Sequence, residues 1–216
     1  MVVFDVDGTL YDQRGLRMAM LGALLANSVR TRSLEVPIVL QAYRHCRERL
    51  AGEMATDFAD RQFADTAMRC GRSPDDVRRI VDEWIENRPL QFLRRYRCAG
   101  IDSLFAVLAA RKVVLAILSD YPAERKLRAL GLSADIMVSA DDHDVGSMKP
   151  HPAGLAKILS QANVEPDRAV MVGDRVDRDW AVADKLGVRA LIRSPRPVSG
   201  IDTFASYREP VFRLHS

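Results

Sequence analysis

Two carboxylates near the start of the chain have the spacing needed for nucleophilic and acid–base chemistry at one place. Asp5 and Asp7 stand two residues apart at the end of a short apolar, β-branched run, and Gly8 follows them. A glycine here favours a sharp turn away from the strand. If Asp5 attacks phosphorus, Asp7 could protonate the leaving alkoxide and later deprotonate the hydrolytic water. A plain turn or a metal site has the same pattern, so these readings stay open.

Two later residues could bind an anion. Ser119 directly follows the apolar run 113–118 and precedes a predicted helix, so its hydroxyl and the next backbone N–H groups suit a phosphoryl oxygen, or alternatively a helix cap. Lys149 is followed by Pro150 and Pro152. A stiff loop could therefore hold its ammonium against a negative charge, although a lone surface lysine is ordinarily solvated.

A third acidic group follows the apolar run 169–172. Asp174 comes after a glycine, and Asp177 and Asp179 follow at short intervals. Carboxylate oxygens are the ligands that Mg²⁺ prefers, and such an ion would mask the repulsion between a carboxylate and a phosphate. Acidic residues also favour the first turn of a helix, and that alternative is stronger for Asp177 than for Asp179.

The elements that must position these residues alternate between strands and helices. We expect the doubly wound, mostly parallel sheet of an α/β, Rossmann-like fold, covered by helices on both faces. Strand ends of such a sheet meet at one edge, where ligands bind, so the four polar signals are predicted to meet there. The predicted strands are 2–6, 113–118, 136–138, 169–172 and 188–192, and the predicted helices are 101–110, 123–130, 152–161 and 176–186.

A long segment between the first two strands has a different pattern. Residues 15–96 show helical spacing of apolar residues and no convincing strand. Ser73 and Pro74 provide a helix start. We therefore predict a core domain from residues 1–12 and 98–216, with an all-helical domain of residues 13–97 inserted after the first strand. The predicted helices in the insertion are 16–29, 36–50, 57–68 and 75–86, and residues 194–216 are predicted to form a surface-packed tail.

Composition narrows the class of partner. The chain has 216 residues, is 48% apolar and carries a formal net charge of +3, which does not favour nucleic acid or a membrane surface. Its three cysteines lack metal-type spacing, and an odd number does not favour a disulfide framework. The start lacks the basic and apolar regions of a leader, and no run approaches about 18 apolar residues. We expect a cytoplasmic protein with a small-molecule partner.

The four signals, in this order and at strand ends, resemble the motifs of the haloacid dehalogenase superfamily, and of its phosphatases in particular. The matching segments are DVDGTL (5–10), ILSD (117–120), KPHP (149–152) and VGDRVDRDWAVA (172–183). The resemblance covers nearly the whole chain. Its helical insertion is similar to the mobile C1 cap of phosphoglycolate phosphatase-like members, which closes over the site.

The resemblance implies a role for each matching residue. Asp5 would be the nucleophile and Asp7 the general acid and base, while Ser119 and Lys149 would hold the phosphate. Further phosphate or substrate contacts are expected from Gly8, Thr9, Asp120 and Arg14.

The resemblance also implies a Mg²⁺ cofactor. Its expected ligands are Asp5, the backbone carbonyl of Asp7, and Asp174, with Asp179 as a supporting acid. The chain departs from the family pattern at two places. The second motif has Asp120 where many relatives have Asn, and the fourth motif has Arg175 and Arg178 where small or amide residues are common.

The implied reaction is Mg²⁺-dependent hydrolysis of a small phosphorylated metabolite through an aspartyl-phosphate. Asp7 argues against a dehalogenase, because a halide leaving group needs no proton. The lack of lysine from residue 11 to residue 97 argues against the family's phosphonate hydrolases, which use a Schiff-base lysine in the cap. A sugar phosphomutase and a non-catalytic binding module remain as alternatives.

Substrate selection is expected to lie in the helical insertion. Residues 11–97 contain sixteen arginines against twelve acidic residues, so an acidic or polyhydroxyl substrate is one hypothesis. Solvated helix faces are the alternative for any single arginine. The candidates are Tyr11, Arg14, Arg17, Arg44 and His45.

Overall fold

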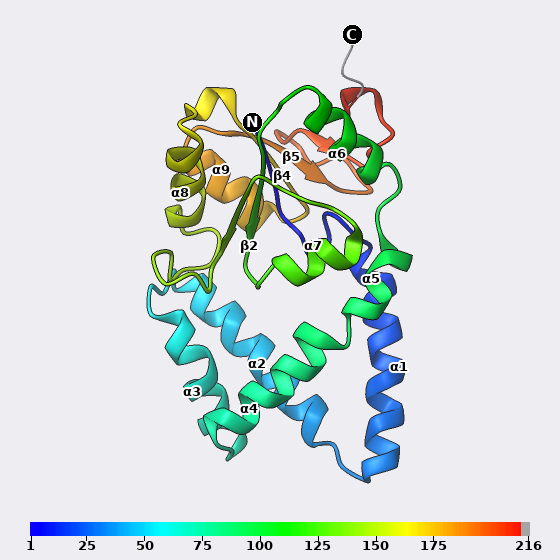
Figure 1. The fold of residues 1–216 in the computed structure, drawn as a ribbon. Helices are drawn as coiled ribbons and strands as arrows, with labels where there is room; N and C mark the ends of the chain where they lie inside the picture. The colour runs from blue at the N-terminus through cyan, green and yellow to red at the C-terminus, as the bar shows by residue number, and fades with distance from the viewer. Residues whose placement is uncertain (213–216) are drawn as a thin grey trace.

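A six-stranded parallel sheet forms the centre of the protein (Figure 1) in the computed structural model, which describes residues 1–212. All its pairings are parallel. The order is β3 (Ile136–Ser139), β2 (Leu115–Ser119), β1 (Val2–Phe4), β4 (Val170–Gly173), β5 (Arg189–Arg193) and β6 (Thr203–Phe204). The order reverses between β1 and β4, and such a switch point opens a crevice at the carboxyl ends of the strands. The predicted α/β fold class is confirmed.

Helices cover both faces of the sheet, as the uninterrupted apolar strands predict. Neighbouring strand residues point to opposite faces, so Phe4 belongs to the apolar cluster on one face and Val3 to the cluster on the other. The first cluster is completed by helices α6 (Ile101–Ala110) and α7 (Glu124–Leu130), and the second by α8 (Ala153–Ala162) and α9 (Ala181–Lys185). Among residues 1–212, no helix combines the length and apolar character that crossing a bilayer requires.

The segment between β1 and α6 is helical, as predicted. In Figure 1 its helices extend from the carboxyl edge of the sheet. Asp12 caps α1 by accepting hydrogen bonds from the backbone N–H groups of Arg14 and Gly15, and Ser73 caps α4 as its sequence suggested. The elements are α1 (Gln13–Thr31), α2 (Glu35–Gly52), α3 (Phe58–Cys70), α4 (Pro74–Val81), a π-helical stretch η1 (Asp82–Asn87) and α5 (Leu90–Tyr96).

The chain enters and leaves this helical segment through two connections that lie side by side. Tyr11 and Arg97 form an antiparallel bridge. The backbone N–H of Asp12 donates to the Tyr96 carbonyl at 2.8 Å, and that of Cys98 donates to the Leu10 carbonyl at 2.9 Å. The two connections are therefore held together at the end of β1, close to Asp5 and Asp7.

Several predicted boundaries differ from the structure. The predicted helix 75–86 passes from α-helix into the π-helical stretch η1, and α5 was not predicted. The predicted tail is also wrong in part, because residues 194–212 include β6, and Tyr207 is buried with its hydroxyl donating to the Thr9 carbonyl at 3.0 Å. Residues 213–216 of that prediction lie outside the described residues.

Close packing of α8 on β2 provides a test of the core that supports Ser119. A Cβ atom added at Gly154 would lie 2.7 Å from Leu118 Cδ1. We expect Gly154→Val to lower the free energy of unfolding by about 1–3 kcal/mol because of overpacking. Chemical denaturation followed by circular dichroism measures this change. Gly52→Val is the control, because nothing lies within 4 Å of a Cβ added there. Equal destabilisation by both variants would contradict the packing argument.

Candidate active site

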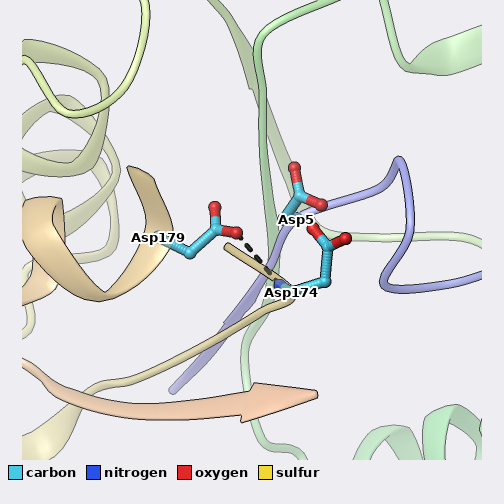
Figure 2. A group of neighbouring side chains, drawn as sticks. All are labelled: Asp5, Asp174 and Asp179. Atoms are coloured by element: carbon cyan, nitrogen blue, oxygen red, sulfur yellow. Dashed lines mark hydrogen bonds between the residues drawn. The ribbon is translucent and has the colours of Figure 1, made fainter. Parts of the chain in front are cut away.

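The predicted site residues come together at the carboxyl edge of the sheet. Asp5 follows β1, Ser119 ends β2, and Asp174 follows β4, while Lys149 arrives from the loop between β3 and α8. Figure 2 shows Asp5 and Asp174 side by side, with Asp179 reaching in from the start of the next helix. The parallel topology thus places residues from four distant segments around one point.

Asp5 is buried between two donors. Its side chain is 8% exposed, and it accepts from Lys149 Nζ at 2.6 Å and from the Thr9 hydroxyl at 2.8 Å. Burial raises the pKa of Asp5 well above its ordinary value, and the neighbouring Asp179 and Asp174 carboxylates act in the same direction, against Lys149. Its Lys149 and Thr9 contacts hold the carboxyl group in a single orientation.

Lys149 is fixed from several directions. Its Nζ donates to Asp179 Oδ1 at 2.6 Å as well as to Asp5, and also to the Leu118 carbonyl at 3.3 Å. Its backbone N–H donates to Asp120 Oδ1 at 2.9 Å. Asp120, predicted as a phosphate contact, therefore holds the Lys149 backbone while also lining the cavity.

Three carboxylates form a cluster suited to a cation. Asp5, Asp174 and Asp179 each offer one oxygen within 4.8 Å of the others. Burial raises the pKa of Asp174 to about 6, and the Asp179 charge adds to that shift. Among residues 1–212, no hydrogen-bond donor is found for the Asp174 carboxylate, whereas Asp179 accepts from Lys149 and from two backbone N–H groups. An oxygen-rich cluster of this kind can bind a divalent metal ion.

Gly8 allows Asp174 to approach the first motif. Its φ is +96°, and a Cβ added there would lie 2.1 Å from Asp174 Oδ2. Only glycine combines that backbone angle with the necessary space.

Asp7 has a separate environment from that cluster. Lys126 Nζ donates to both of its carboxylate oxygens, at 3.0 and 2.9 Å, and the Tyr11 hydroxyl donates to Oδ1. Burial by itself would raise the pKa of Asp7, but Lys126 and the Tyr11 hydrogen bond outweigh burial and hold the pKa below its ordinary value. The Asp7 side chain is outside the Asp5–Asp174–Asp179 cluster, and a metal contact from its backbone carbonyl stays a prediction.

Sequence reasoning missed Lys126. Its side chain is only 6% exposed, and it lies on α7, the helix that follows Ser119. The chain contains few lysines, and Lys126 occurs shortly after the second motif, which is the one signal that could have identified it.

The other residues predicted to contact phosphate or substrate lie in different surroundings. Ser119 is 1% exposed, and its hydroxyl accepts from the Tyr121 backbone N–H at 3.2 Å. Thr9 is engaged with Asp5. Arg14 does not line the cavity, whereas the exposed Arg17 does. The prediction that Arg14 contacts substrate is therefore not supported by its place on the helix.

A cavity of about 440 Å³ lies between this edge of the sheet and the helical segment. Asp5, Asp7, Lys149 and Asp174 line one part of it. The carboxylates and the ammonium are therefore accessible to a small molecule although each is largely buried.

Comparison with models of protein families identifies the family of this chain. The model of the haloacid dehalogenase-like hydrolases matches residues 1–187. The chain belongs to the haloacid dehalogenase-like hydrolase family. The expected family and the expected enzyme class, a hydrolase, are thereby confirmed.

Individual relatives agree with this assignment. Phosphoglycolate phosphatase from Rhodospirillum rubrum is 30% identical over 226 aligned positions, covering 99% of this chain and 83% of that protein. The 2-haloacid dehalogenase from Pseudomonas syringae has a TM-score of 0.63 at 24% identity, with 97% and 90% of the two chains covered. CbbY from Rhodobacter sphaeroides, in complex with xylulose-(1,5)bisphosphate, has a TM-score of 0.62 at 19% identity, with 96% and 94% covered. These two structural likenesses show the shared fold.

The two arginines that depart from the family pattern contact the helical segment. Arg175 Nη1 donates to Glu48 Oε1 at 2.9 Å, and Arg178 Nη2 donates to Glu48 Oε2 at 2.6 Å. Arg178 also donates to the Lys149 carbonyl. They therefore link the fourth motif to α2 on the opposite side of the cavity.

Arg47, also missed by sequence reasoning, makes a second link. Its buried guanidinium donates to the Asp120 carbonyl and to the Gln62 side chain, and it lies 4.0 Å from the centre of the Tyr121 ring. The second motif is thus held by α2 as well as by the sheet.

The Asp7–Lys126 pair supports a stability prediction. Lys126→Met would leave the buried Asp7 carboxylate without its cation, and we expect a loss of about 3–5 kcal/mol in the free energy of unfolding at neutral pH without added metal. Because the folded-state pKa of Asp7 is lowered, the pair's stabilisation is present above the unfolded pKa and is lost as the pH falls. The difference between wild type and variant should therefore shrink toward acid pH, as measured by urea denaturation.

The same substitution at a surface lysine is the control for this prediction. Lys157 pairs with Asp142 and with the exposed Asp144, so Lys157→Met should cost only about 0–1 kcal/mol. A loss for Lys126→Met no larger than that of the control, or a difference independent of pH, would contradict the assigned pair.

Proposed function

We propose that this protein is a phosphatase that hydrolyses a small phosphorylated metabolite, with Asp5 as the nucleophile. The observation that carries the proposal is the Asp5 carboxylate, buried at the cavity wall and oriented by Lys149 and Thr9 beside a second acid. The likeness to a phosphoglycolate phosphatase along the whole chain supports a phosphomonoester as substrate. No feature of the described residues favours the phosphomutase or the non-catalytic alternative.

The residues around Asp5 suit an incoming phosphate. The Lys149 ammonium offsets the charge of the phosphate and of Asp5 as they approach, and the hydroxyl of Ser119, the last residue of β2, is the proposed contact for a phosphoryl oxygen. Attack by an Asp5 oxygen forms the new phosphorus–oxygen bond while the ester bond breaks, which leaves an aspartyl-phosphate and an alkoxide. Water then attacks phosphorus and frees Asp5.

Asp7 is the proposed proton carrier for both displacements. Tyr11 and Lys126 fix its carboxyl group on the side of the cavity away from Asp174. As a carboxylate it can accept the proton of the hydrolytic water, and in its protonated form it can neutralise the alkoxide. The same group therefore serves both steps.

The acid cluster fits a magnesium ion. Asp5 and Asp174 would hold it together with the backbone carbonyl of Asp7, and Asp179 would orient Lys149 and the fourth-motif loop. When bound, the ion supplies positive charge that offsets the repulsion between nucleophile and phosphate. The raised pKa of Asp174 fits this assignment, since neighbouring carboxylates that repel each other are relieved by a shared cation.

We further propose that residues 13–97 form a cap domain on a core of residues 1–12 and 98–216. The paired connections at Tyr11 and Arg97 form a narrow link on which the cap can move. Arg47 and Glu48 would hold it over the site, where it excludes water. We propose that the enzyme works in the cytoplasm.

Asp5→Asn tests the nucleophile. We expect at least a thousandfold loss of inorganic phosphate release from a panel of metabolite phosphates with Mg²⁺, because a neutral amide is a poor nucleophile. Asp184→Asn, at an exposed position on α9, is the matched control and should keep wild-type turnover. Circular dichroism would verify that both variants fold. A folded Asp5→Asn protein with normal activity would contradict the covalent mechanism.

Binding of Mg²⁺ should depend on pH through Asp174. A carboxylate must lose its proton to ligate a metal. Because burial raises the pKa of Asp174 to about 6 and also raises the pKa of Asp5, we expect the Mg²⁺ affinity measured by calorimetry to fall as the pH is lowered through this range. Asp174→Asn should weaken binding and reduce this pH dependence. An unchanged affinity in that variant would exclude Asp174 as a ligand.

A further inference from the structure

The cavity continues beyond the residues that handle phosphate. Its volume of about 440 Å³ is in the range that holds drug-sized ligands. One part is lined by the charged residues of the sheet edge, and the rest is lined by the helical segment. The chemistry of that second part decides which leaving group fits.

One wall of the second part is an apolar face of α1. Leu16, Met20 and Leu24 all line the cavity, and their spacing of four residues places them above one another on a single helix face. Leu16 is 6% exposed and Met20 is 8% exposed, so the surrounding core covers most of both side chains, whereas Leu24 is partly exposed.

A second wall, from η1 and α5, is apolar too. Trp84 and Ile85 from the π-helical stretch η1 and Leu90 from α5 line it. Trp84 is 5% exposed, and the Arg88 guanidinium lies 4.0 Å from its ring centre. Three arginines of the helical segment line the cavity. Arg47 is bound to the Asp120 carbonyl, and the other two, Arg17 and Arg44, are exposed.

We propose that these two walls form an apolar subsite, and that the substrates are phosphate monoesters whose leaving group carries an apolar body. The proposal rests on the phosphatase function proposed above and names its substrate class. A short, fully polar acid would fill only the charged end of the cavity and would leave the partly exposed apolar side chains that line the rest of it, such as Leu24 and Leu90, in contact with water. An apolar body would cover them, and each buried methylene would tighten binding about fourfold.

A series of n-alkyl phosphates tests the subsite. With Mg²⁺ and wild-type enzyme, we expect kcat/KM to rise about fourfold per methylene from ethyl to hexyl phosphate, mainly through KM, and to exceed that for 2-phosphoglycolate at the longer chains. Leu24→Gln should flatten the series. Leu25→Gln, on the same helix but 60% exposed and outside the cavity lining, should keep the wild-type slope.

Two results would overturn the subsite while leaving the phosphatase intact. One is a flat or falling series in an enzyme that releases phosphate from 2-phosphoglycolate. The other is an equal loss of slope in Leu24→Gln and Leu25→Gln.

Ligand binding separates failure of the subsite from failure of the phosphatase. Hexylphosphonate, which cannot be hydrolysed at its carbon–phosphorus bond by this chemistry, should bind more than tenfold tighter than methylphosphonate and change the fluorescence of Trp84. Trp180→Phe would assign the signal to Trp84. If no ester releases phosphate but this preference holds, the subsite stands and the phosphatase proposal fails. If the two phosphonates bind equally, the subsite is overturned whatever the activity.

Discussion

The Lys149 ammonium, held between Asp5 and Asp179, is the interaction on which the rest of the site depends. Both contacts are 2.6 Å long, and the three side chains are almost entirely buried. A buried charge is tolerated only when it is paired, and removing one partner of such a group is strongly destabilising. The loops after β1, β3 and β4 must therefore meet here. Asp120 and Arg178, which bind the Lys149 backbone, strengthen this convergence.

Two aspartates separated by one residue acquire opposite properties from their surroundings. The pKa of Asp5 is raised because the side chain is buried and lies beside two further acids, Asp179 and Asp174. The pKa of Asp7 is lowered because its carboxylate contacts Lys126 and Tyr11. These surroundings favour the protonated form of Asp5 and the carboxylate form of Asp7. The sharp turn at Gly8 makes this difference possible, because it lets each carboxyl group meet its own partners.

The helical segment contributes a different kind of information. Its links to the motif loops, through Arg47 and Glu48, are polar and lie beside the acid cluster. Its contribution to the farther part of the cavity is mainly apolar, from α1, η1 and α5. In the proposed function, reaction chemistry would take place at one end of the cavity and leaving-group recognition at the other. This division explains how a shared set of motifs can serve members with different substrates.

The amino-acid sequence by itself determined the strands β1 to β5, the helical insertion and which residues meet at the carboxyl edge of the sheet, because apolar runs and strand-end rules are local or topological. Parallel strands bring Asp5, Lys149 and Asp174 together whatever the details of packing. Only the tertiary structure placed Lys126 beside Asp7, across 119 residues of chain, because that contact depends on the rotation of α7 against β1. It likewise decided that Arg17 rather than Arg14 lines the cavity. Helix rotation is set by long-range packing, which sequence periodicity specifies too coarsely to predict individual contacts.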